Sequence, residues 1–177
     1  MTERPLTLET LIRLPLRRLA AVHAAGTRPD VAALAGQEYR GINRPATSRL
    51  LGIRRFVKGF ALDSDGSAHG YNKQVRGAAL DRPWTPHRRK DGRVAYAPFV
   101  VLPGPEDRSP ACLLLDYGAP ALREPGVAGR LRDVLVRVNP GSDELLLGRA
   151  YLALGARRMP VGWFLLDHLG PGDPDRC

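Results

Sequence analysis

The C-terminal run over residues 131–169 constrains the fold of this chain most strongly. Residues 131–138 alternate in hydrophobicity with three valines on one face, which predicts a strand with one buried side. Residues 139–143 combine asparagine, proline, glycine and aspartate, which all favour turns. Residues 144–154 and 161–169 are two further strand-like runs joined by a short connection. The sequence therefore predicts an antiparallel meander of three strands.

One feature of this meander suggests a curled sheet. Gly148 lies inside an apolar strand, where glycine is costly unless the strand bends or another group approaches its backbone closely. In the last strand, Trp163 and Leu165 alternate onto the same face. We expect the meander to belong to a barrel or a tightly curved sheet.

The preceding part of the chain adds more strands but little helix between them. Asp63 to Ser67 is a turn signal between two of these strands, so they are predicted to form a hairpin. Closely spaced strands of this kind favour an antiparallel barrel or sandwich over alternating strand–helix units. The further strands are predicted at residues 37–42, 53–62, 69–76, 94–102 and 111–117, with loops at 77–92 and 119–129.

Residues 6–25 have a helical pattern, with Thr7 as a plausible N-cap and Pro15 kinking the helix or starting a second one. One interpretation is a helix that packs across a barrel mouth or against its outer wall. The other is a basic amphipathic helix that touches a membrane surface. Short helical turns are also predicted at residues 31–34 and 45–51.

The length of 177 residues fits one domain, with a helical segment at 1–30, a barrel at 34–169 and a tail at 170–177. No apolar run is long enough for a membrane span, and arginines interrupt the N-terminal apolar residues, so we expect no signal peptide. Two isolated cysteines, Cys112 and Cys177, do not suggest a disulfide framework. These features favour a reducing bacterial cytoplasm.

The formal net charge is +9, and 24 of the 27 basic residues are arginines. Such a charge attracts nucleic acid or anionic lipid. The arginines are spread along the chain, however, and the dense cluster at residues 87–90 with Arg93 is interpreted as a solvated loop. Aromatic residues make up 6% of the chain, which argues against a nucleic-acid-binding sheet. Peripheral membrane contact stays open. Trp84 is expected to pin its loop or to line a pocket rim.

Several motifs follow the order seen in a family of small bacterial proteins. Residues 34–41 resemble a Gly-x-Trp-x-Gly opening, with Glu38 and Tyr39 near the position of its tryptophan. Residues 54–60 resemble the family's next strand, and residues 113–117 its aliphatic strand with an acidic end. The strand pair at 131–148 and the aromatic strand at 163–166 complete a resemblance to the bacterial GXWXG-motif family, over about half of the chain.

The members of that family have no known function and are regarded as calycin-like barrels suited to lipids or other hydrophobic molecules. The resemblance thus implies a mainly β protein, an antiparallel calycin- or lipocalin-like β-barrel of about eight strands with an N-terminal helical segment. It also implies a cavity for a small hydrophobic ligand.

The sequence lacks the familiar catalytic and cofactor-binding motifs. No nucleophile elbow, phosphate loop or dinucleotide fingerprint is present. The four histidines have no metal-ligand spacing. We therefore predict no catalytic residue, no metal site and no cofactor.

Polar residues inside apolar strands remain as candidate ligand contacts. Lys58 lies between Phe56 and Phe60 on one strand face, where burying an unpaired charge is expensive. Asp116 follows three leucines, and Arg149 follows Gly148. The full candidate set is Tyr39, Lys58, Tyr71, Asn72, Tyr96, Asp116, Arg149 and Trp163.

These residues allow three interpretations. In the first, Asp116, Arg132, Asp133 and Arg149 form buried ion pairs or face solvent. In the second, some of the polar residues line a cavity and hold the polar head of an apolar ligand. In the third, Asp116 or Lys58 acts as an acid or a base with a shifted pKa.

For the function we expect non-catalytic binding of a small hydrophobic or lipid-like ligand. The alternatives are an enzyme that acts on a hydrophobic molecule on the same barrel, and a basic module that binds nucleic acid or an anionic membrane. The oligomeric state is left open.

Overall fold

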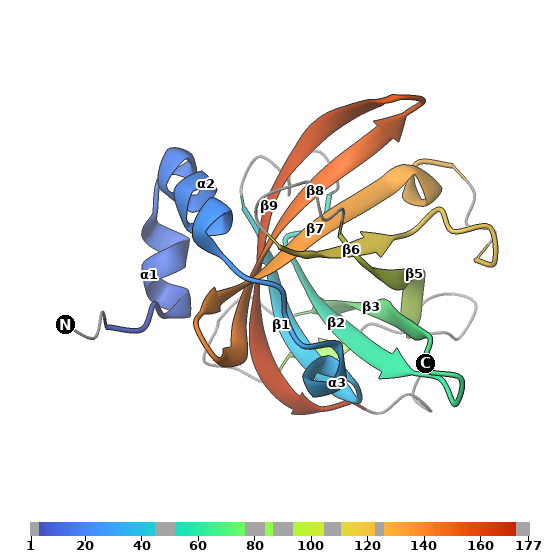
Figure 1. The fold of residues 1–177 in the computed structure, drawn as a ribbon, viewed down its shortest axis with the longest axis horizontal. Helices are drawn as coiled ribbons and strands as arrows, with labels where there is room; N and C mark the ends of the chain where they lie inside the picture. Colours follow the sequence, from blue (N-terminus) through green and yellow to red (C-terminus); the bar gives the residue numbers. More distant parts are fainter. Residues whose placement is uncertain are drawn as a thin grey trace.

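The computed structural model describes residues 4–44, 52–76, 84–86, 94–104, 111–122 and 126–172. Within them, the strands are β1 (Gln37–Asn43), β2 (Arg55–Leu62), β3 (Ala68–Arg76), β4 (Thr85–Pro86), β5 (Ala95–Pro103), β6 (Leu113–Asp116), β7 (Leu131–Asn139), β8 (Ser142–Leu154) and β9 (Arg157–Pro171). They form one sheet in the order β2-β1-β9-β8-β7-β6-β5-β3-β4, and β2 also pairs with β3. Eight strands thus close into an antiparallel barrel, which is consistent with a calycin-like fold (Figure 1). Strand β4 is an extra strand that pairs with β3.

The barrel follows the order of the chain almost throughout. Each barrel strand pairs with its neighbour in sequence, and β9 returns to pair with β1. The predicted C-terminal meander is confirmed, because β7, β8 and β9 pair antiparallel in succession. Its two tight turns contain Gly141 and Gly155, with φ angles of 75° and 60°. Glycine adopts this left-handed region without steric cost.

Some boundaries differ from the prediction. Strand β9 continues to Pro171, past the expected end at 169, because it pairs with Gln37 at the start of β1. Within the predicted loop 77–92, Thr85–Pro86 pairs with β3. The Arg55 guanidinium lies 5.7 Å from the centre of the Trp84 ring, which fits a tryptophan that pins this segment. The helix predicted at 45–51 and the basic cluster at 87–93 lie outside the described residues.

The N-terminal segment forms two helices, α1 (Leu8–Arg13) and α2 (Leu16–Ala25), as the proline between them suggested. The Thr7 hydroxyl accepts a hydrogen bond from the Thr10 amide at 3.3 Å, so the predicted N-cap is confirmed. A single turn, α3 (Val31–Leu34), follows. None of the helices in the described residues is long and apolar enough to cross a membrane.

Helices α1 and α2 pack against the outer wall of the barrel beside β7, β8 and β9 (Figure 1). Their apolar side chains meet the outward residues of these strands in one buried cluster. The cluster includes Leu8, Leu11, Leu19, Val136, Leu147, Trp163 and Leu165. A second cluster fills part of the barrel interior, with Phe60, Phe99, Leu115, Leu135, Leu146 and Phe164 among its members. The strands beneath the helices are therefore buried on both faces.

This double burial explains why the inward face of β7 is not the one that the valines suggest. Val136 points outward under the helices, whereas Asp133 and Leu135 belong to the barrel interior. A strand covered on both sides has apolar residues on both faces, so alternation alone does not identify the inner one. Leu145, Leu146 and Leu147 in β8 are consecutive apolar residues for the same reason, since both faces of this strand are buried.

Gly148 is confirmed as a place of close approach. The ring of Phe164, its register partner on β9, lies where a side chain at position 148 would project. A methyl group added there would overlap the ring atoms of Phe164. Glycine at this position therefore lets the Phe164 ring cross the inner surface of β8.

We predict that Gly148→Ala lowers the free energy of unfolding by about 2 kcal/mol, because the added methyl forces the buried Phe164 ring out of its position. Urea denaturation followed by tryptophan fluorescence measures the change. Gly155→Asn, in the β8–β9 turn, is the control and should cost less than about 0.5 kcal/mol, since asparagine tolerates positive φ. A Gly148→Ala protein as stable as the wild type would contradict this packing.

Candidate functional site

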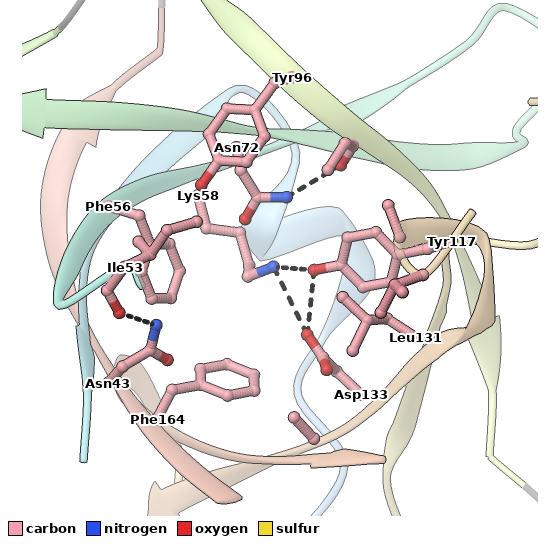
Figure 2. A pocket seen from close by; sticks show the side chains of 14 residues that line it. Asn43, Ile53, Phe56, Lys58, Asn72, Tyr96, Tyr117, Leu131, Asp133 and Phe164 are labelled. Carbon is pink, nitrogen blue, oxygen red and sulfur yellow. Dashed lines mark hydrogen bonds and ion pairs between the residues drawn. The ribbon is translucent and has the colours of Figure 1, made fainter. Parts of the chain in front are cut away.

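A cavity of about 420 Å³ lies inside the barrel, which is within the range of small-molecule binding sites. Its wall is mostly apolar and includes Ile53, Phe56, Leu131, Ala150 and Phe164. The polar side chains on the wall are Asn43, Lys58, Asn72, Tyr96, Tyr117 and Asp133. Figure 2 shows these polar groups converging on the interior from different strands.

Lys58 reaches the interior because of the two-residue period of β2. Phe56, Lys58 and Phe60 share one strand face, as the sequence predicted. In the structure this face points inward, so the Lys58 amine lies in the barrel interior with the two phenylalanines. The Lys58 side chain is 1% exposed. A charge at this depth requires partners, and the barrel supplies them from β7 and from the end of β6.

The partners are Tyr117 and Asp133. The Lys58 ammonium donates a hydrogen bond to the Tyr117 hydroxyl, with an Nζ–Oη distance of 2.6 Å. Tyr117 in turn donates to the Asp133 carboxylate at 3.0 Å. Lys58 Nζ also lies 3.7 Å from the same Asp133 oxygen, Oδ2. Lys58, Tyr117 and Asp133, which we call the buried triad, thus form a closed triangle of polar contacts (Figure 2).

Aromatic rings surround the amine on its other sides. Lys58 Nζ lies 4.4 Å from the ring centre of Phe99, 5.5 Å from that of Phe164 and 5.6 Å from that of Phe56. The negative faces of aromatic rings attract a cation and offset part of its lost hydration. The cavity therefore holds a cation at its wall without exposing it to bulk water.

Burial changes the proton affinities of the triad. It lowers the pKa of Lys58 to about 8, although the nearby Asp133 carboxylate opposes this shift. Burial also raises the pKa of Asp133, against the opposing effect of Lys58. The pKa of Tyr117 is raised well above its ordinary value, chiefly by burial, so the phenol keeps its proton. The lysine and the aspartate are thus brought closer to exchanging a proton than they are in water.

Two buried amides complete the polar wall. Asn72 donates a hydrogen bond to the carbonyl oxygen of Ala97 at 2.9 Å. Ala97 has a φ of 44°, a left-handed conformation that is unfavourable for alanine, and it lies where the β3–β5 register shifts. Asn43 donates to the carbonyl oxygen of Ile53 at 2.8 Å. Strained backbone of this kind tends to occur at functional sites.

The structure brings three of the eight sequence-predicted ligand contacts, Lys58, Asn72 and Tyr96, to this cavity. Tyr39 is buried elsewhere in the barrel interior, with its ring centre 5.7 Å from that of Phe60. Tyr71 donates a hydrogen bond to Glu38 at 2.7 Å.

The remaining three predicted contacts have other surroundings in the structure. Asp116 forms an ion pair with Arg132 at 3.0 Å, as the first interpretation of the sequence expected. Trp163 lies in the cluster beneath helices α1 and α2, and the Arg149 guanidinium stacks on its ring at 4.9 Å. These side chains are not among the residues that line the cavity.

Asn43 and Tyr117 were not predicted as cavity residues. Asp133 was one of four charged residues expected to form ion pairs, to face solvent or to line a cavity, but it was not in the candidate set. A signal for Asp133 exists, since it is the charged position between Leu131 and Leu135 on one face of β7. Tyr117 has a similar signal, because it continues the alternation of Leu113 and Leu115 on the interior face, although it follows the last residue of β6.

No family model, no curated protein and no solved structure matches this chain. The resemblance to the GXWXG-motif family therefore stays a prediction. Within the part of the chain that the structure describes, no group of three or more histidine, cysteine, aspartate or glutamate side chains is arranged to hold a metal ion.

We predict that Lys58→Met lowers the free energy of unfolding by about 3 kcal/mol, because it leaves Asp133 buried without its cation. The double variant Lys58→Met/Asp133→Leu should recover most of this loss, since it removes both charges and keeps the volume apolar. Urea denaturation of the wild type and both variants measures the difference. A double variant no more stable than Lys58→Met would show that the two groups are not coupled.

The stability of the protein should also rise with pH above 8. The folded chain releases the Lys58 proton at a pKa of about 8, whereas the unfolded chain releases it near the ordinary value of 10.5. Between these values the unfolded state binds more protons, so the free energy of unfolding increases with pH. Relative to the double variant, we expect the wild type to gain about 1–2 kcal/mol between pH 8 and 10. Denaturant titrations across this pH range measure the gain. A difference in unfolding free energy between the two proteins that does not change with pH would contradict the lowered pKa of Lys58.

Proposed function

We propose that this protein binds a small, largely apolar molecule inside its barrel and holds it without transforming it. The observation that carries the proposal is an apolar cavity of about 420 Å³ with the buried triad of Lys58, Tyr117 and Asp133 on its wall. An apolar wall with a few converging polar groups is the usual composition of a small-molecule site. The apolar area supplies affinity, and the polar groups orient the ligand.

The charges on the wall favour a ligand without net charge. Among the described lining residues, Lys58 is the basic side chain and Asp133 is the carboxylate, and their charges compensate each other. A charged head group would lose its hydration in an apolar interior, and no free charge of opposite sign on the described part of the wall would compensate for this loss. We therefore infer a lipid-like molecule with an uncharged polar group, such as a carbonyl or a hydroxyl. A cytoplasmic location is supported by the sparse cysteines and by the free thiol of Cys112.

A second candidate function is acid–base catalysis on such a molecule. The observation in its favour is that burial shifts the pKa values of Lys58 and Asp133 toward each other in a cavity. Such pairs are frequent among catalytic groups, but structural ion pairs show the same shifts. The two functions differ in what leaves the cavity: a binder releases its ligand unchanged, whereas an enzyme releases a product.

We predict saturable binding of one molecule of N-phenyl-1-naphthylamine, an uncharged apolar dye whose fluorescence rises in apolar surroundings. Ala150→Leu should weaken this binding by about tenfold or more, since it fills the cavity from strand β8. Fluorescence titration gives the dissociation constants, and native mass spectrometry gives the stoichiometry.

Ala153→Leu, on the same strand but not among the lining residues, is the matched control and should bind the dye like the wild type. Ala128→Phe narrows the cavity from a segment outside β8 and should also weaken dye binding. It keeps the test valid if Ala150→Leu fails to fold. If the wild type shows no saturable binding, or if all variants bind equally, the dye does not enter the cavity and the proposal is wrong.

A further inference from the structure

Lys58 is an unusual choice for a basic residue in this chain. The sequence contains 24 arginines and 3 lysines, and the basic side chain on the cavity wall is one of the three lysines. A guanidinium stays protonated in proteins and is a poor nucleophile, whereas a lysine amine can lose its proton and react. The cavity thus has a primary amine at its most buried polar position.

We propose that Lys58 captures the carbonyl group of an apolar aldehyde or ketone as a reversible Schiff base. This inference rests on the proposed function and names the ligand class of the same cavity. Its geometric basis is the position of Lys58 Nζ at the cavity wall, 2.6 Å from the Tyr117 hydroxyl and 3.7 Å from the Asp133 carboxylate. These distances place a proton donor and a proton acceptor beside the reacting amine.

The step balances without any further reagent. The Lys58 ammonium first transfers a proton to the Asp133 carboxylate, and the neutral amine then attacks the carbonyl carbon. The new C–N bond displaces the carbonyl π electrons onto oxygen, and Tyr117 relays a proton from nitrogen to this oxygen. The Asp133 carboxylic acid then protonates the hydroxyl group, the C–O bond breaks, and water leaves as the C=N bond forms. The products are one protonated imine, one water and the restored carboxylate.

The cavity suits the product as well as the amine. A protonated imine carries the same single positive charge as the ammonium, so Asp133 remains its counter-ion. The rings of Phe56, Phe99 and Phe164 face this charge in the same way. Burial lowers the pKa of Lys58 to about 8, which increases the fraction of reactive neutral amine near neutral pH.

The test compares nonanal with nonan-1-ol, which differ only in the carbonyl group. The wild-type protein is incubated with nonanal and sodium cyanoborohydride, which reduces an imine to a stable secondary amine. Intact mass measurement counts the added groups, and peptide mapping locates them. We expect one adduct at Lys58, formed about tenfold or more faster than at Lys73, because the Lys58 amine lines the cavity that takes up nonanal, whereas Lys73 is not among the lining residues.

Three variants sharpen the comparison. Lys58→Arg keeps a positive charge but cannot form an imine, so the adduct should disappear. Lys73→Arg changes the lysine that pairs with Glu38 at 2.7 Å and should leave the Lys58 adduct unchanged. Tyr117→Phe removes the proton relay but keeps the ring, and it should slow trapping at Lys58 by about tenfold or more. Mapping on the wild-type protein gives an answer even if a variant fails to fold.

Nonan-1-ol separates this inference from the proposed function. If nonan-1-ol displaces N-phenyl-1-naphthylamine but nonanal gives no adduct at Lys58, the cavity binds apolar ligands and the Schiff base is wrong. Equal labelling of all lysines would also overturn the inference. If neither nonan-1-ol nor nonanal displaces the dye or reacts, both the inference and the proposed function fail.

Discussion

The pairing of the first barrel strand with the last is the constraint on which the rest of the structure depends. Strand β1 pairs with β2 on one side and with β9 on the other, and β2 pairs with β3. This closure removes the unpaired edges that an open sheet of these strands would present. It also creates an interior that solvent does not fill freely, so the cavity and the buried triad exist only because the ring of strands is complete.

Within this closed interior, the Lys58–Asp133 pair is costly for the fold. Desolvation of two charges is repaid only in part by their attraction, and apolar residues of similar volume often give an equally stable or more stable protein. Here the pair is supported by the Tyr117 hydroxyl and by aromatic rings around Lys58 Nζ. Replacing both charges with apolar residues is therefore expected to keep most of the stability of the fold. This balance favours our proposal that the triad serves a ligand inside the barrel.

Helices α1 and α2 stabilise the outside of the barrel and do not line the cavity. They cover the outer face of β7, β8 and β9, and they bury Trp163 there rather than in the interior. His23 on α2 packs against the Trp163 ring at 5.3 Å, and burial lowers its pKa, so its neutral form is favoured in the folded protein. The most apolar strands of the barrel thus have a core on each side, which fixes the wall that carries Asp133 and Ala150.

The strands, their turns and their antiparallel order were predictable from local patterns, because alternation, glycine and proline act over a few residues. Gly148 and Lys58 were also identifiable, since a glycine and a charge interrupt apolar strands there. The inward face of β7 was not, because helices bury its outer face as well. Trp163 was expected to contact a ligand and lies beneath helices α1 and α2 instead, whereas Asp133, outside the candidate set, lines the cavity. The sequence by itself determined a strand-rich chain with an amine between two phenylalanines on one strand face. Only the tertiary structure decided that Tyr117 and Asp133 meet this amine, because residues 58, 117 and 133 become neighbours through barrel closure and not through any local pattern.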